Sequence, residues 1–190
     1  MEKILFINAC LREESRTLEL TKHVLNSLQG ETQEVKLYDL DLQPLDLKGL
    51  VKRNKANMNK DFSDEVFDLA KQFSKAETIV IAAPYWDLMF PSILKNYFEN
   101  ITISGLTFVY GEDGRPKGLC NAKKLIYVTT SGGPIIQNFG YDYTNALAKM
   151  FFGIKTVKFI SAQGLDIYGA NTTEILNKAI DTISIVLQEE

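Results

Sequence analysis

Cysteine and histidine are scarce in this sequence, and their scarcity excludes several kinds of protein. The 190 residues contain two cysteines, Cys10 and Cys120, and a single histidine, His23. Two cysteines so far apart do not make the disulfide framework of a small secreted domain, so we expect a reducing, cytoplasmic setting. No cysteine and histidine residues stand at the spacing of metal ligands, and we therefore expect no metal site.

Long apolar runs and an excess of positive charge are also missing. No apolar stretch reaches the roughly 18 residues that a membrane-spanning helix needs, and the first three residues lead directly into a short strand. We therefore expect neither a membrane span nor a signal peptide. The formal net charge of −3 argues against a mainly electrostatic grip on nucleic acid or anionic lipid, so we expect neither as a partner.

What the sequence does contain is an alternation of strand-like and helical segments. Short apolar runs are typical of strands buried on both faces of a sheet, and they predict strands over 3–7, 34–38, 78–82, 124–128 and 156–160. Apolar residues at helical spacing predict helices over 17–28, 64–74, 143–152 and 172–187, and one more that starts near Pro91. Residues 39–59 are polar, and we expect irregular chain there with a short helix near 48–53.

Five strand–helix units predict one α/β domain over residues 1–190. We expect a doubly wound, five-stranded parallel sheet with the flavodoxin-like order 2-1-3-4-5 and helices on both faces. No Gly-x-Gly-x-x-Gly follows the first predicted strand, so the dinucleotide-binding fingerprint is absent. A strand-like segment at 107–110, followed by a glycine-rich turn, predicts a hairpin-like excursion around residues 104–120.

Polar, turn-rich loops follow the first, third and fourth predicted strands. In a doubly wound sheet such loops meet at a crevice where ligands bind. The first loop brings Ser15, Arg16 and Thr17 to the start of a predicted helix. Free N–H groups and the helix dipole bind anions there, so this loop suits a phosphate group. The alternative is that Ser15 or Thr17 only caps the helix.

The other two loops offer an aromatic surface and exposed backbone. Residues 84–88 read Pro84, Tyr85, Trp86, Asp87 and Leu88, and they include the chain's only tryptophan. Aromatic side chains at a crevice enclose flat ring systems, although Tyr85 and Trp86 are also compatible with a core or an interface. The third loop reads Thr130, Ser131, Gly132 and Gly133. Glycine admits a ligand close to the backbone, and the alternative is an ordinary tight turn.

A phosphatase is a competing interpretation of the first loop. Cys10, five further residues and then Arg16-Thr17 match the Cys-x5-Arg-Ser/Thr pattern of protein tyrosine phosphatases, whose low-molecular-weight members carry it after their first strand. Glu13 and Glu14 would repel a dianionic substrate, and the chain lacks the Asp-Pro pair of those enzymes. The other possibility for Cys10 is a small residue packed beneath the loop.

Together, these segments resemble the FMN-dependent NAD(P)H oxidoreductases of the azoreductase and quinone reductase family. The resemblance covers nearly the whole chain and includes residues 94–98 and 105–110. It implies noncovalently bound FMN, with Cys10, Ser15, Arg16 and Thr17 around the phosphate. It also implies that residues 84–88 line the isoalloxazine ring, with backbone N–H groups near N5 and O4, and that residues 130–133 cover its pyrimidine end. The family often has Asn where this chain has Asp87.

The resemblance further implies an activity and an assembly. The enzyme would pass two electrons from NADH or NADPH, by ping-pong hydride transfer, to a small-molecule acceptor such as a quinone, azo or nitro compound. Flavin N5 would carry the chemistry, so no side chain is assigned as catalytic, and Trp86 and Tyr110 would wall the substrate pocket. The family is typically homodimeric. The alternative is a flavodoxin-like electron carrier, although such carriers are usually more acidic than a net charge of −3.

Overall fold

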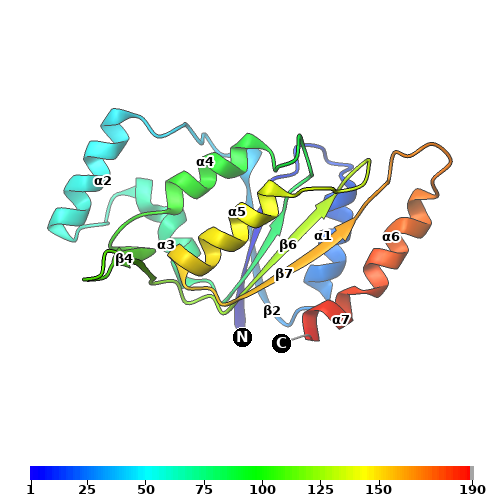
Figure 1. Cartoon of the computed structure of the whole chain (residues 1–190). Helices are drawn as coiled ribbons and strands as arrows, with labels where there is room; N and C mark the ends of the chain where they lie inside the picture. Colours follow the sequence, from blue (N-terminus) through cyan, green and yellow to red (C-terminus); the bar gives the residue numbers. More distant parts are fainter. Residues whose placement is uncertain (189–190) are drawn as a thin grey trace.

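Parallel strands form the centre of the molecule, which is described here from a computed structural model of residues 1–188. The strands are β1 (Glu2–Asn8), β2 (Gly30–Lys36), β3 (Thr78–Ala82), β6 (Lys124–Thr130) and β7 (Thr156–Ala162). They pair in parallel in the order β2-β1-β3-β6-β7 (Figure 1). This order confirms the predicted flavodoxin-like, doubly wound sheet.

Helices cover both faces of this sheet. One layer contains α1 (Arg16–Asn26), α6 (Thr172–Asp181) and α7 (Ile183–Gln188). The other contains α3 (Asp68–Lys75), α4 (Ser92–Ile101), α5 (Phe139–Leu147) and the π-helical turn η3 (Ala148–Phe152). The helix α2 (Leu47–Asn59) stands apart from the sheet in Figure 1, between the short 3-10 turns η1 (Leu37–Asp39) and η2 (Glu65–Phe67).

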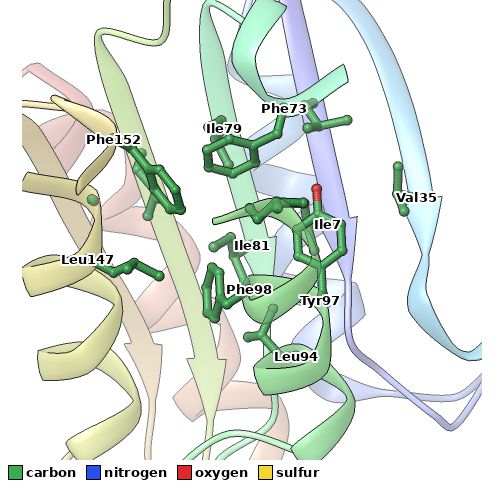
Figure 2. Close-up of a cluster of buried hydrophobic side chains, with 14 of the residues drawn as sticks. Ile7, Val35, Phe73, Ile79, Ile81, Leu94, Tyr97, Phe98, Leu147 and Phe152 are labelled. Carbon is green, nitrogen blue, oxygen red and sulfur yellow. The ribbon is translucent and has the colours of Figure 1, made fainter. Parts of the chain in front are cut away.

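The strands are apolar throughout because each supplies side chains to two hydrophobic cores. In β1, Leu5 and Ile7 belong to the core that contains residues of α3 and α4, whereas Ile4 and Phe6 belong to the core that contains residues of α1. Figure 2 shows the first core, in which Phe73, Tyr97 and Phe98 from the helices pack against the strand residues Ile7, Ile79 and Ile81. Burial on both faces explains why the central strands were predictable from continuous apolar runs.

The sequence prediction was wrong around the edge strand and the segment that follows it. β2 occupies Gly30–Lys36 rather than 34–38, and most of its residues are exposed because nothing pairs with its outer edge in the sheet. Its early residues are polar for that reason and gave no apolar signal. Gly30 lies so close to β1 that a Cβ atom would stand 2.5 Å from the Glu2 carbonyl oxygen. The expected short helix at 48–53 is the longer helix α2, whose start is capped by Asp46.

Later boundaries also differ in detail. The hairpin is confirmed as antiparallel strands β4 (Phe108–Tyr110) and β5 (Pro116–Gly118). α5 begins four residues before the predicted position 143, because the Asn138 side chain caps it by accepting from the Tyr141 N–H at 2.9 Å. The single helix predicted over 172–187 divides at Thr182 into α6 and α7. In residues 1–188, no helix combines the length and the apolar character needed to cross a bilayer.

Candidate functional site

A pocket of about 230 Å³ opens at the carboxyl ends of β1, β3 and β6. It joins the three loops that the sequence analysis singled out to a fourth loop, which follows β7. The predicted site residues that line it are Ser15, Arg16, Thr17, Pro84, Tyr85, Trp86, Thr130, Ser131 and Gly132. The predicted residues outside this lining are Cys10, Asp87, Leu88, Tyr110 and Gly133.

The start of α1 forms one wall of the pocket and is prepared to bind an anion. Ser15 is the N-cap residue, and its hydroxyl accepts from the Leu18 N–H at 3.3 Å. Within residues 1–188, the N–H groups of Arg16 and Thr17 have no protein acceptor. Ser15 can therefore cap the helix while the helix start binds an anion. The cap uses only the Leu18 N–H, and the N–H groups of Arg16 and Thr17 stay free at the positive end of the helix.

A buried pair of hydroxyl groups fixes this helix start against the sheet. The Oγ1 atoms of Thr17 and Thr130 lie 2.6 Å apart, and both side chains are buried. Thr21 also donates to the Thr17 carbonyl oxygen at 2.7 Å. This contact fixes the position of the first loop relative to the third, so the fold itself forms the pocket.

The aromatic segment forms a tight two-residue turn. The N–H of Trp86 donates to the Met89 carbonyl and the N–H of Met89 donates to the Trp86 carbonyl, each at 2.8 Å. Between them, Asp87 and Leu88 have φ values of 49° and 68°. Positive φ at both central residues is the type I′ geometry, which normally favours glycine, asparagine or aspartate, so Leu88 is the unusual residue here. Non-glycine residues in this region cost on the order of 1–3 kcal/mol each, and such strain is often kept at functional sites.

This turn also leaves hydrogen-bond donors unused. The Tyr85 N–H donates to the Thr130 carbonyl at 3.1 Å, and the Trp86 N–H is used inside the turn. The N–H groups of Asp87 and Leu88 have no protein acceptor among the described residues. They are therefore the donors that the turn offers to a ligand beside Trp86, whose side chain is 41% exposed.

The turn is held from behind by the loop that precedes α5. The Phe139 N–H donates to the Leu88 carbonyl at 3.0 Å, and the Tyr85 hydroxyl donates to the Gln137 carbonyl at 2.8 Å. These bonds tie the turn to the start of α5 and to the residues just before it. They explain how two non-glycine residues are kept at positive φ.

The glycine loop is shaped by contacts with the loop after β7. The Ser131 N–H donates to the Ala162 carbonyl at 3.0 Å, and the Ser131 hydroxyl donates to the Gly133 carbonyl at 2.6 Å. A Cβ atom on Gly132 would stand 2.3 Å from an Asp166 carboxylate oxygen. A side chain at Gly132 would thus require the Asp166 carboxylate to move, whereas a Cβ atom on Gly133 would meet nothing within 4 Å.

Asp166 lines the pocket and was not predicted by the sequence analysis. It lines the pocket from the loop between β7 and α6, and its carboxylate pairs with Arg16 at 2.8 Å. The Arg16 guanidinium also donates to the Leu165 carbonyl at 3.2 Å. A loop after the fifth strand was a detectable signal, because all strand ends of a doubly wound sheet border the same edge.

Cys10 lies beside the pocket rather than in its lining. Its thiol is half-buried, with Sγ 3.9 Å from the Ala82 carbonyl oxygen. Burial raises the pKa of Cys10 to about 11, a hydrogen bond with Ser15 lowers it, and the Glu34 carboxylate raises it again. A phosphatase nucleophile needs a depressed thiol pKa. This environment therefore disfavours the phosphatase interpretation and favours the packed cysteine.

Tyr110 is not brought to this pocket within one chain. It lies on β4, is 60% exposed and packs edge-on against Phe108 at a ring-centroid distance of 5.3 Å. In Figure 1, β4 and α1 lie at opposite sides of the molecule. The part of the chain described by the structure also contains no cluster of three or more His, Cys, Asp or Glu side chains suited to a metal ion.

Comparisons with known proteins point in the same direction as this geometry. A family model described as a flavodoxin-like fold matches residues 2–186. A curated relative from Coprothermobacter proteolyticus, named FMN-dependent NADH:quinone oxidoreductase, is 35% identical over 95% of both chains. A relative of the same name from Lachnoclostridium phytofermentans is 32% identical over the full length of both.

Solved structures give the same result for the fold. An FMN-dependent NADH-azoreductase from Bacillus anthracis, solved in complex with FMN, superposes with a TM-score of 0.80 at 26% identity over 97% of both chains. Another azoreductase from Bacillus anthracis superposes with a TM-score of 0.83 at 22% identity over 98% of both chains.

Proposed function

This chain belongs to the family with the flavodoxin-like fold, and we propose that it is an FMN-dependent NADH:quinone oxidoreductase, like the relatives that carry that name. One observation carries the proposal. The start of α1, which is suited to bind an anion, and the chain's only tryptophan line the same pocket. The backbone N–H groups at the helix start and in the turn after Trp86 have no protein acceptor within residues 1–188. A phosphate-bearing cofactor with a flat heteroaromatic ring matches both ends of that arrangement.

The residues present fit FMN in three places. The N–H groups of Arg16 and Thr17, with the Ser15 hydroxyl, would hold the phosphate. Trp86 would lie against the isoalloxazine ring, and the unpaired N–H groups of the turn at 87–88 would meet its heteroatoms. Residues 130–133, with open space over Gly133, would cover the pyrimidine end. Cys10 would support the phosphate loop from behind rather than contact the phosphate.

The protein's part in the reaction is to bind and orient. Bound FMN would supply two-electron hydride chemistry. Trp86 and the turn at 87–88 would set the face of the ring that NADH and the acceptor approach in alternation. No side chain of the pocket needs to donate a proton, because solvent reaches the exposed Trp86 face. We infer a ping-pong cycle in which quinones, azo or nitro compounds take the place left by the nicotinamide.

We also propose that the protein is a cytoplasmic homodimer. Each chain would form one domain over residues 1–190. A pocket of about 230 Å³ is smaller than the roughly 300–1,000 Å³ of typical ligand sites, so one chain encloses only part of a flavin. Large apolar side chains near the turn are exposed, including Leu88, Ile136 and Phe139. A second copy covering this face would complete the substrate pocket, and the exposed Tyr110 would reach it from the partner chain.

An absorption spectrum of the purified protein, followed by anaerobic NADH addition, tests the proposal. We expect flavin bands and their rapid bleaching by NADH, then recovery of the bands when a quinone is added. Parallel addition of NADPH measures the preference between the two coenzymes. A protein that takes up FMN but is not bleached by NADH without a partner reductase would be an electron carrier. A protein that takes up no FMN would refute the assignment.

A further inference from the structure

An ion pair crosses the phosphate end of the pocket. The Arg16 Nη2 atom lies 2.8 Å from a carboxylate oxygen of Asp166, and its Nη1 atom donates to the Leu165 carbonyl at 3.2 Å. Both charged side chains line the pocket, and they are 35% and 64% exposed. Two of the five guanidinium N–H donors are therefore directed away from any phosphate bound at the helix start.

The carboxylate of Asp166 is fixed in this place by the glycine loop. The Asp166 N–H donates to the Gly132 carbonyl at 2.9 Å, and the missing Cβ atom of Gly132 leaves the room that an Asp166 carboxylate oxygen occupies. The Asp166 carboxylate therefore lies beside the glycine loop, where it meets Arg16.

The charged side chains of the pocket cancel one another. Arg12 and Arg16 supply two positive charges, and Glu14 and Asp166 supply two negative charges. The attraction for a phosphate then comes mainly from the N–H groups of the helix start, because each guanidinium has a carboxylate in the same lining. Among these carboxylates, Asp166 is the one that directly contacts an arginine of the phosphate loop.

We propose that Asp166 is a specificity-determining residue that competes with the flavin phosphate for Arg16 and so lowers the preference of the pocket for FMN over unphosphorylated riboflavin. The inference rests on the proposed function, since it takes FMN as the ligand. The phosphate and the carboxylate are both anions that accept from the same guanidinium, and like charges in one small pocket repel. Riboflavin lacks the phosphate and does not experience this competition.

Flavin titration of the apoprotein tests the proposal. Quenching of flavin fluorescence gives Kd for FMN and for riboflavin with the wild type and with Asp166→Asn, which keeps the shape and an acceptor oxygen but removes the charge. We expect Asp166→Asn to tighten FMN binding by about fivefold, the size of a partly exposed charge interaction, and to leave riboflavin binding unchanged. Added salt should reduce the difference between variant and wild type for FMN.

A matched control and a second variant complete the experiment. Asp68→Asn removes the same charge from an exposed ion pair with Lys71 on α3, on the other face of the sheet, and should change neither Kd. Asp166→Ser should reproduce the FMN selectivity of Asp166→Asn, with circular dichroism confirming the fold. Weaker FMN binding, or an equal change for both flavins, would overturn the inference while leaving the proposed function intact. A wild type that binds neither flavin would overturn the proposed function instead.

Discussion

Removing one hydroxyl of the Thr17–Thr130 pair should lower the free energy of unfolding by more than the loss of an exposed hydrogen bond would. The two oxygen atoms lie 2.6 Å apart in a buried position between α1 and β6. In Thr17→Val, the shape is nearly kept, but the Thr130 hydroxyl loses its partner. A buried polar group without a partner costs about 1–3 kcal/mol. For a chain of this size, each kcal/mol lowers Tm by roughly 2–4 °C.

The reasoning predicts that the two substitutions are not additive. Thr130→Val leaves the Thr17 hydroxyl unpaired and should cost a similar amount. The double variant removes both hydroxyls and leaves none unpaired, so its cost should be at least about 0.5 kcal/mol smaller than the sum. Chemical denaturation of the flavin-free protein measures this, because bound flavin would add a stability that depends on the flavin affinity of each variant.

A control substitution distinguishes the cost of leaving a partner hydroxyl unpaired from the cost of losing any buried hydroxyl. Thr144→Val removes a buried hydroxyl that donates to the Gly140 carbonyl within α5, at 2.7 Å, so no second side chain loses a partner. It should cost less than either single variant of the pair. If the double variant costs the full sum of the two single variants, the hydroxyls do not depend on each other and the account of this contact is wrong.

The remaining predictions concern the loops of the site. Ser15→Asp should weaken FMN binding by at least tenfold in a fluorescence titration, because it places a charge against the phosphate; unchanged affinity would contradict the placement of the phosphate. Trp86→Ala should change NADH-dependent turnover strongly and Tm little, since the side chain is 41% exposed; a large fall in Tm with normal turnover per bound flavin would make Trp86 structural. The Cys10 pKa of about 11 lies above its ordinary value of 9.0. Stability from the neutral thiol is therefore complete below pH 9 and lost as the pH rises towards 11, and Cys10→Ser should reduce this loss in pH-dependent unfolding.

The sequence predicted the parts of the fold that depend on local burial. β3 has the predicted boundaries, because each of its five residues is buried and apolar or small. β2 was placed too late, since an edge strand exposes polar residues that resemble a loop. The length of α2 was also missed. The 13 residues of that helix bury only Ala56, so helical periodicity of apolar positions is weak there.

The site was predictable where it follows from strand ends and was not where it depends on distant contacts. Ser15, Trp86 and Gly132 were identified because their loops directly follow predicted strands, and the fold brings them to one pocket. Asp166 was missed because its importance comes from Arg16, 150 positions away in sequence. Its place in the loop after the fifth strand was a detectable signal, but no local pattern marks its pairing with Arg16 before the topology is known.

The turn at Asp87 and Leu88 shows why local propensity fails at this site. Asp87 is compatible with positive φ, but the following Leu88 is not a typical residue for it, so the sequence does not predict two consecutive positive φ values. The conformation is imposed by the bonds between Trp86 and Met89 and by the Phe139 N–H on the Leu88 carbonyl. The N–H groups of Asp87 and Leu88 have no protein acceptor in residues 1–188. Backbone strain tends to be kept at functional sites, and the strained turn at 87–88 therefore supports the proposal that this turn binds a ligand.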